Sequence, residues 1–348
     1  MIQTKEKSSI LLIYTGGTIG MKEDPSIQAL RPFDFSQILA EVPELRKFAY
    51  KIDSFTFDPL IDSSDVEPSN WKKLVSIIRE KYTDYDGFVV LHGTDTMAYS
   101  ASALSFMIEG LTKPVIFTGS QLPIGVPRTD GKENLISAVE IAAAKDEEGH
   151  ALVPEVCICF DNMLMRGNRT TKINSDNFRA FRSENFPPLA EAGISIRYNR
   201  QLIRKPLDWN AMPVFHDNLD TRVSILKIHP GITPQVVHAI LCGKESRAVI
   251  LETYGAGNAP SKKWFIDMVK EADDMGKILM NVTQCIAGSV NMDIYATGKC
   301  LKDAGVINGY DSTTEGALAK LFYLLGQHED NLAVKNCLET DMRGEISK

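Results

Sequence analysis

The sequence predicts an α/β protein with two domains, a larger N-terminal one and a smaller C-terminal one. Short apolar runs end in polar, glycine-containing turns, and segments of helical spacing lie between them. Strands that alternate with helices favour a mostly parallel sheet, which we expect to be mixed in the first domain and parallel in the second. A segment without either period, residues 199–221, separates the two halves. We therefore expect domains over residues 1–198 and 222–348, joined by this linker.

The strands of the first domain are predicted by continuous apolar runs. Runs of about 4–8 residues bounded by turns are typical of strands that are buried on both faces. They occur at residues 10–14, 88–91, 115–117 and 156–160. Apolar residues recur at helical spacing over 71–82, behind Pro68 and Ser69, and over 97–108. We expect a helix in each of these two segments.

The second domain repeats the alternation. Apolar runs at residues 223–226, 248–251 and 278–282 predict three further strands. The segment Ser312-Thr313-Thr314-Glu315 matches a capping box, and apolar residues at helical spacing follow it to Leu325. We therefore expect a helix that begins at this box.

Composition and charge exclude several classes of protein. A net charge of −7 provides no basic surface for nucleic acid or anionic lipid, and 44% hydrophobic with 24% charged residues is ordinary for a globular core. No apolar stretch approaches the ~20 residues of a membrane helix, and residues 1–7 lack the apolar region of a signal peptide. The six cysteines form no C-x-x-C pair, which favours a reducing compartment. We expect a cytoplasmic protein with no nucleic-acid or membrane partner.

Hydroxyl side chains follow several of the predicted strands, where parallel sheets bind ligands. A single Ser or Thr there more commonly caps a helix, but this chain carries a set of them at successive strand ends: Thr15, Thr18, Ser63, Ser64, Thr94, Thr96, Thr118 and Ser120. The segment 15–20, Thr-Gly-Gly-Thr-Ile-Gly, fits neither the Walker nor the dinucleotide-binding glycine pattern. A hydroxyl beside glycine backbone N–H groups suits a Thr nucleophile with an oxyanion hole.

A Thr nucleophile needs a base, and a Lys next to a carboxylate provides one if burial lowers its pKa. Residues 92–97, His-Gly-Thr-Asp-Thr-Met, offer a second Thr and a carboxylate at the start of a helix. Lys172 follows Arg166-Gly167-Asn168-Arg169-Thr170-Thr171, but nothing in the spacing brings it near Thr94. The histidines form no H-x-x-x-H or H-E-x-x-H pattern, so we expect no metal site.

Seven segments in the same order resemble motifs of the L-asparaginase/glutaminase family, and in particular its cytoplasmic bacterial type I members. The resemblance runs from about Ser9 to Glu345. The segments are 14–20, 62–65, 91–97, 118–121, 166–172, 254–258 and 281–285. It implies a larger and a smaller α/β domain and hydrolysis of L-asparagine to L-aspartate and ammonia without a cofactor.

Residue roles follow from the same resemblance. Thr18 would be the nucleophile that forms an acyl-enzyme, and Thr94, Asp95 and Lys172 a second polar triad in which Lys172 supplies the base. Asp95 would also bind the substrate ammonium, and the segment with Asp62, Ser63 and Ser64 the α-carboxylate. Family active sites lie between protomers, and Asn258 matches a position from the neighbouring subunit. A homodimer or homotetramer is therefore implied.

Two segments depart from the family pattern. Many members carry a Tyr seven to ten residues after the first-motif Thr, whereas residues 21–30 contain none, and Tyr295 matches a position from which some relatives use a Tyr instead. We hypothesise that Tyr295 assists Thr18, with a packing role as the alternative. Thr171 and Cys285 match an activating asparagine site of some relatives. An Arg of that site is replaced here by Glu252, which would repel the carboxylate of an effector and argues against cooperativity.

Three other functions compete with L-asparagine hydrolysis. A glutaminase-asparaginase differs by one methylene of substrate, worth only ~1–3 kcal/mol in a pocket. An archaeal glutamyl-tRNA amidotransferase subunit shares two motifs but is expected to need an extra N-terminal domain and a basic surface. A non-catalytic amino-acid sensor would not need Thr18, Thr94, Asp95 and Lys172 together.

Overall fold

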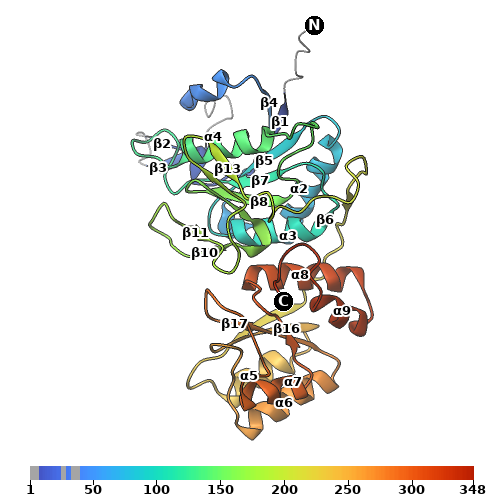
Figure 1. Ribbon diagram of the computed structural model, residues 1–348. Coiled ribbons are helices and arrows are strands. Elements are labelled where there is room, and N and C mark those ends of the chain that lie inside the picture. Colours follow the sequence, from blue (N-terminus) through green and yellow to red (C-terminus); the bar gives the residue numbers. More distant parts are fainter. Residues whose placement is uncertain (1–7, 25–28, 33–39) are drawn as a thin grey trace. The chain divides into compact units, whose positions relative to one another are not determined.

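The computed structural model describes residues 8–24, 29–32 and 40–348 (Figure 1). The chain divides into two compact units, Met1–His216 and Asp217–Lys348. Each unit has a sheet of its own, so each is described by itself.

The first unit is built on an eight-stranded sheet. Its strands lie in the order β13-β12-β9-β8-β7-β5-β1-β4. The five strands from β4 to β8 pair in parallel, and β9, β12 and β13 extend the sheet by antiparallel pairing. Their bounds are β1 (Ser9–Tyr14), β4 (Lys51–Thr56), β5 (Gly87–Leu91), β7 (Val115–Thr118), β8 (Val156–Phe160), β9 (Met163–Arg166), β12 (Ala190–Ala192) and β13 (Ile196–Tyr198).

Burial explains why the central strands are apolar throughout. Every residue of β5, β7 and β8 is buried, because helices cover both faces of the sheet. Helix α4 (Gly131–Ala143) packs on β1, β5, β7 and β8, and its core includes alternate strand residues such as Ile10, Leu12 and Val89. Helices α2 (Pro68–Lys81) and α3 (Met97–Met107) lie on the opposite face (Figure 1).

The second unit has a smaller, all-parallel sheet. Its order is β15-β16-β17-β18, with bounds Val223–Lys227, Ala248–Thr253, Ile278–Thr283 and Ile307–Asn308. Five helices belong to this unit among the described residues: α5 (Pro234–Leu241), α6 (Lys263–Asp274), α7 (Ala296–Asp303), α8 (Thr314–Gln327) and α9 (Asn331–Leu338). The predicted fold class, a larger mixed α/β domain and a smaller parallel one, is thus confirmed.

Short elements complete the described chain. Three two-stranded pairs join β2 (Met21–Asp24) to β3 (Ala29–Pro32), β6 (Ile108–Glu109) to β14 (Val214–Phe215), and β10 (Thr171–Lys172) to β11 (Phe181–Arg182). Four 3₁₀ turns occur at η1 (Thr18–Gly20), η2 (Pro43–Lys47), η3 (Ser63–Asp65) and η4 (Gly167–Arg169). Across the described residues, no helix combines the length and apolar content needed to cross a membrane.

One predicted helix start is wrong by a residue. The N-cap of α8 is Thr313, whose hydroxyl accepts from the backbone N–H of Gly316 at 3.0 Å. Ser312, the first residue of the predicted capping box, instead donates its hydroxyl to the carbonyl of Gly309 at 2.7 Å. Ser312 and Thr313 both carry a hydroxyl. The capping-box pattern in the sequence begins at Ser312, whereas the helix is capped by Thr313.

Candidate active site

The polar segments singled out in the sequence follow three neighbouring parallel strands. Thr18 lies in η1 after β1, Ser63 and Ser64 lie in η3 after β4, and Thr94 and Asp95 come after β5. Since β4, β1 and β5 are adjacent and parallel, their carboxyl ends share one edge of the sheet. This edge is the candidate active site.

Glycines bring these loops into direct backbone contact. A Cβ atom added to Gly17 would lie 2.4 Å from the backbone N of Gly93, and one added to Gly93 would lie 2.4 Å from Ser63 Oγ. Gly17 also has φ 93° and ψ 170°, a conformation that is essentially restricted to glycine. Thr18 follows Gly17 and Thr94 follows Gly93. Both threonines therefore come directly after the point where the backbones of the two loops meet.

Replacing Gly17 by Ala should therefore destabilise the first unit strongly. The backbone strain alone costs about 1–3 kcal/mol, and the clash with the backbone of Gly93 adds to it. Gly149→Ala is the matched control, because Gly149 has a similar φ of +89° but open space around it. Urea unfolding should show a clearly larger loss of stability for Gly17→Ala, and equal losses for the two variants would contradict the close approach.

The η1 turn that carries Thr18 is clamped from two sides. The hydroxyl of Tyr14 donates to the carbonyl of Gly20 at 2.9 Å, and the N–H of Ile124 donates to the carbonyl of Ile19 at 3.2 Å. Burial raises the pKa of Tyr14, so its phenol stays protonated and remains a donor. Thr18 itself is partly buried.

Lys172 reaches the same edge from a distant part of the chain. Its Nζ donates to Thr94 Oγ1 at 2.8 Å and to Asp95 Oδ1 at 2.7 Å. The Lys172 side chain is 17% exposed and that of Asp95 is 62% exposed. The ammonium is thus shared between a hydroxyl and a carboxylate on consecutive residues.

The segment before Lys172 explains how it arrives there. Turn η4 is buried and packs against α3, where a Cβ on Gly167 would lie 3.0 Å from the Cβ of Ala101. Just before η4, Arg166 pairs with Glu155 through its Nε at 2.6 Å and its Nη2 at 3.2 Å, and both side chains are buried. Because α3 begins just after Asp95, a segment fixed along α3 delivers Lys172 to its start.

Gln121 belongs to the site and was not assigned a role from the sequence. Its Oε1 accepts from Thr94 Oγ1 at 3.4 Å, and its Nε2 donates to the carbonyl of Asn177 at 3.1 Å. Its backbone N–H points to both carboxylate oxygens of Asp130, at 3.1 and 3.0 Å. Gln121 stands in one of the seven quoted segments, which is the signal that identifies it.

A buried chain of hydrogen bonds ends at the peptide before Thr94. Trp71 Nε1 donates to Ser100 Oγ at 2.9 Å, and Ser100 Oγ lies 2.9 Å from His92 Nε2. His92 Nδ1 lies 2.7 Å from the carbonyl of Gly93. Because a carbonyl only accepts and Trp only donates, these partners assign the proton of His92 to Nδ1 and leave Nε2 as an acceptor from Ser100. Burial lowers the pKa of His92 to about 4, so the ring is neutral at pH 7.

This neutral histidine predicts a specific loss of stability in acid. The folded pKa of about 4 lies below the ordinary histidine value of 6.5, so the unfolded chain binds the proton first as the pH falls. Stability is fully present above pH 6.5, and about 3 kcal/mol of it should be lost between pH 6.5 and 4. The difference in unfolding free energy between wild type and His92→Gln should shrink over this range. The partly exposed His150 provides the control His150→Gln, and a difference that is constant with pH for His92→Gln would contradict the assignment.

The residues expected to bind the substrate α-carboxylate already form hydrogen bonds within the protein. Asp62 Oδ1 accepts from both the N–H and the hydroxyl of Ser64, each at 3.0 Å, as the N-cap of η3. Ser63 is 5% exposed, and its carbonyl accepts from Thr96 Oγ1 at 2.6 Å. Asp62 therefore orients Ser64, while Thr96 ties the turn to the start of α3.

The other hydroxyls at the strand ends serve the fold. Thr15 donates to the carbonyl of Leu91 at 2.9 Å, Thr118 to that of Cys159 at 2.8 Å, and Ser120 to that of Leu122 at 2.5 Å. Each of these hydroxyls satisfies a backbone carbonyl at the sheet edge.

Three of the predicted site residues belong to the second unit. Asn258 Oδ1 accepts from Thr297 Oγ1 at 2.7 Å, which ties it to the first turn of α7. Tyr295 is the N-cap residue of the same helix and is 55% exposed. Cys285 is exposed, whereas Thr171, of the first unit, is partly buried in β10. The structure thus brings Asn258 close to the helix that begins after Tyr295.

The loop that lacks a Tyr is described only in part. Residues 21–24 and 29–32 form the hairpin β2–β3, and residues 25–28 lie outside the described residues. Glu252, which replaces the Arg of the activating site, accepts from Thr314 Oγ1 at 2.7 Å and lies 3.5 Å from Lys227 Nζ.

Comparisons with known proteins agree with these motifs. The family model described as Asparaginase, N-terminal, matches residues 9–204, and the one described as Glutaminase/Asparaginase C-terminal domain matches residues 222–338. L-asparaginase 1 of Escherichia coli (strain K12) is 44% identical over 98% of this chain and 99% of its own length. The 60 kDa lysophospholipase of Homo sapiens is 40% identical over 97% of this chain and 61% of its own length.

A solved structure extends the agreement to the fold. The crystal structure of L-asparaginase I from Vibrio cholerae O1 biovar eltor str. N16961 is 41% identical, covers 98% of this chain and 100% of its own, and has a TM-score of 0.88. The two family models, the L-asparaginase relative and the solved structure all match asparaginases. This chain therefore belongs to the asparaginase family.

Proposed function

We propose that the protein hydrolyses the side-chain amide of L-asparagine to L-aspartate and ammonia, without a cofactor. The observation that carries the proposal is the placement of Lys172 Nζ on both Thr94 Oγ1 and Asp95 Oδ1. We expect Thr18 to reach this group, because the backbones of Gly17 and Gly93, which precede Thr18 and Thr94, approach closely. Nucleophilic catalysis on an amide can use such a set, which consists of two threonine hydroxyls, a lysine and a carboxylate.

Thr18 is the proposed nucleophile. Its hydroxyl oxygen attacks the amide carbon of asparagine, the proton of the hydroxyl passes to the base, and the amide nitrogen leaves as ammonia after it is protonated. An aspartyl ester on Thr18 remains, and water then cleaves this ester to release aspartate and restore the hydroxyl. Lys172 serves as the base in both steps, with Thr94 between its Nζ and the reacting groups.

The same edge offers complementary partners for the two charges of an amino acid. Asp95 is largely exposed and provides an acceptor for the α-ammonium in addition to Lys172. The hydroxyl of Ser63 provides a donor for the α-carboxylate, and that of Ser64 provides a second once it turns away from Asp62, to which it donates in the free protein. An amino acid held at both charges presents its side-chain amide to Thr18, which orients the reacting atoms before attack.

Ammonia release tests this proposal and its rivals. We expect L-asparagine to be hydrolysed with a higher kcat/KM than L-glutamine. Equal turnover of both would change the function to a glutaminase-asparaginase. Absence of ammonia from both would overturn the hydrolase proposal and favour an amino-acid sensor.

The shape of the asparagine curve tests regulation in the same assay. Glu252 stands where the resembling regulated enzymes use an Arg, and its carboxylate is held by Thr314. A carboxylate there repels an effector's carboxylate, so we propose that Thr171 and Cys285 bind no activating asparagine. The saturation curve should be hyperbolic, and a sigmoidal curve would contradict this.

We further propose that the active enzyme is a homodimer or homotetramer in which Asn258, and with it Tyr295, complete the site of a neighbouring protomer. Support comes from the family resemblance and from the contact that ties Asn258 to the helix capped by Tyr295.

All six cysteines are free, in agreement with action in the reducing cytoplasm.

Mixed oligomers test the shared site. Thr18→Ala and Asn258→Ala chains should each have little activity alone. After they are unfolded and refolded together in equal amounts, one site of each mixed dimer combines an intact Thr18 with an intact Asn258. About a quarter of wild-type activity should return. Tyr295→Phe can replace Asn258→Ala in the same experiment, and no recovery in either mixture would contradict a site shared between protomers.

A further inference from the structure

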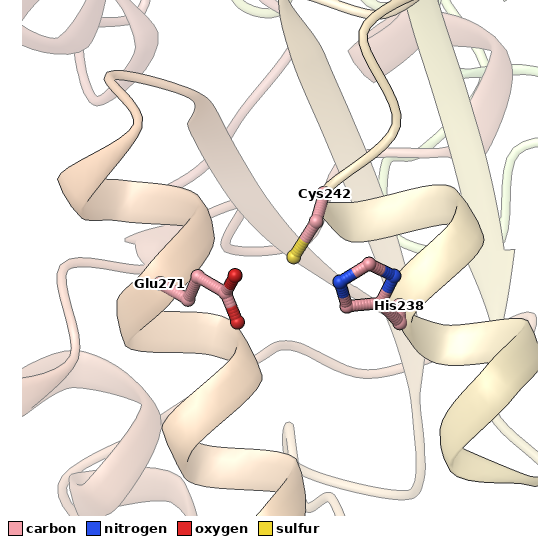
Figure 2. A group of neighbouring side chains, drawn as sticks. All are labelled: His238, Cys242 and Glu271. Carbon is pink, nitrogen blue, oxygen red and sulfur yellow. The ribbon is translucent and has the colours of Figure 1, made fainter.

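Three side chains of different chemistry, none of which has been assigned a role above, converge on one surface of the second unit. Figure 2 shows the imidazole of His238, the thiol of Cys242 and the carboxylate of Glu271 facing one another between two helices. Their ligand atoms all lie within 4.8 Å of one another. A nitrogen, a sulfur and an oxygen ligand are thus present at one point.

The helices fix this arrangement through their buried neighbours. His238 and Cys242 are four residues apart, so they share one face of α5, of which Cys242 is the C-cap residue. Val237 and Leu241, just before them, are fully buried, and Ala272, just after Glu271 on α6, is fully buried in the same core. Because α5 and α6 pack through this core, the register of the three ligands is determined by the fold.

Among the described residues, the three side chains form no hydrogen bond. Within this part of the chain, neither a hydrogen bond nor an ion pair involves the imidazole of His238, the thiol of Cys242 or the carboxylate of Glu271, although the charge of Lys277 acts on the thiol. The nearby ammonium of Lys277 is directed elsewhere, since its Nζ donates to the carbonyl of Gly243 and to the carbonyl and hydroxyl of Ser246. The ligands are therefore available to an exogenous cation.

We propose that His238, Cys242 and Glu271 bind one zinc ion, with water as the fourth ligand. A neutral imidazole, a thiolate and a carboxylate balance the charge of Zn²⁺, and zinc accepts all three ligand types in a tetrahedral site. Such a site requires ligand atoms roughly 3.5 Å apart, so His238 and Glu271, which are both exposed, must move slightly toward the buried sulfur. The ion would join the end of α5 to α6.

Zinc binding at this site releases a proton. The thiol of Cys242 gives up its proton to bind the ion as a thiolate. The S–H bond breaks, the sulfur electron pair forms the Zn–S bond and the proton passes to solvent, without any change of oxidation state.

The other group of metal-ligating types among the described residues is less suited. Asp146 Oδ1 already accepts from the N–H groups of Glu148 and His150, at 3.0 and 2.9 Å. The ring of His150 is stacked on Trp209 with centroids 4.4 Å apart. This group also has no sulfur ligand, which makes the two groups spectroscopically distinct.

Cobalt(II) provides the decisive probe, because a Co²⁺–thiolate bond gives a charge-transfer band that oxygen and nitrogen ligands do not. The full-length protein is stripped of metal with a chelator and titrated with Co²⁺ and then with Zn²⁺. We expect one equivalent of Co²⁺ to produce the band and Zn²⁺ to abolish it. Cys242→Ser should lose the band, whereas Cys300→Ser, at an exposed cysteine of the same unit, should keep it.

Two surface variants keep the test valid if Cys242→Ser fails to fold. His238→Gln and Glu271→Gln change exposed side chains and should leave circular dichroism unchanged while weakening metal affinity by at least about tenfold. Absence of a Co²⁺–thiolate band in the wild type, or a band that persists in Cys242→Ser, would overturn the proposal. Unchanged affinity in both surface variants would do so as well.

Discussion

Replacement of Thr18 by Ala is expected to lower kcat for L-asparagine by at least about 10⁴-fold, as loss of a nucleophile does in other hydrolases. The reason is chemical, because no ester can form without the hydroxyl. The η1 turn should persist, since the bonds that hold it come from Tyr14 and from the backbone of Ile124. Thermal unfolding should therefore change little, and the loss should appear in kcat rather than in folding.

Two matched variants separate the role of Thr18 from that of its surroundings. Thr18→Ser keeps the hydroxyl and should retain measurable turnover. Thr15→Val removes the neighbouring hydroxyl, which donates to the carbonyl of Leu91, and should cost about 1 kcal/mol of stability while turnover persists. Substantial ammonia release by Thr18→Ala would remove Thr18 from the mechanism.

Replacement of Lys172 by Met is expected to lower kcat by about 10²- to 10⁴-fold, the usual contribution of a general acid–base group. Met is similar in length but cannot accept a proton or donate to Thr94. The ion pair with Asp95 should matter little for stability, because that carboxylate is 62% exposed and screened by water.

Two further lysine variants distinguish a base from a positioning charge. Lys172→Arg keeps the positive charge beside Asp95 but cannot act as a base at neutral pH, so it should be nearly as inactive as Lys172→Met. Lys145 has a comparable ion pair with Asp86 at 2.8 Å elsewhere in the first unit, and Lys145→Met should leave kcat unchanged. Recovery of activity in Lys172→Arg would show that charge alone is required.

Sequence patterns were sufficient for the buried part of the fold. Strands β1, β5, β7 and β8 are apolar at nearly every position because helices cover both of their faces. The antiparallel strands β12 and β13 are three residues each and have no such run, since they pair at the sheet edge. Tertiary pairing, rather than local pattern, makes them strands.

Without the family resemblance, the site was predictable only where it follows strand ends. Thr18 and Thr94 follow β1 and β5, which apolar runs predict, so their proximity follows from a parallel sheet. Ser63 follows the largely exposed β4, which no apolar run predicts. Lys172 is 78 residues from Thr94, and only the packing of η4 on α3 explains their contact. The residues His92 and Ser100 form part of a buried network that has no periodic signature.

The cluster of His238, Cys242 and Glu271 shows a limit of searching a sequence for fixed metal-binding motifs. A pattern of two histidines finds no metal site in this chain, yet His238 and Cys242 have the same four-residue spacing with a sulfur in place of the second imidazole. Glu271 comes from a separate helix, so its contribution depends on the packing of α5 against α6.

The most direct test of the central claim is to identify the covalent intermediate. The protein is mixed with L-asparagine, quenched in acid during turnover, digested and mapped by mass spectrometry, and a parallel reaction contains hydroxylamine. We expect an aspartyl ester on Thr18 and partial diversion of the product to the hydroxamate. An ester on Thr94 instead, or no ester together with no hydroxamate, would contradict the proposal that Thr18 is the nucleophile.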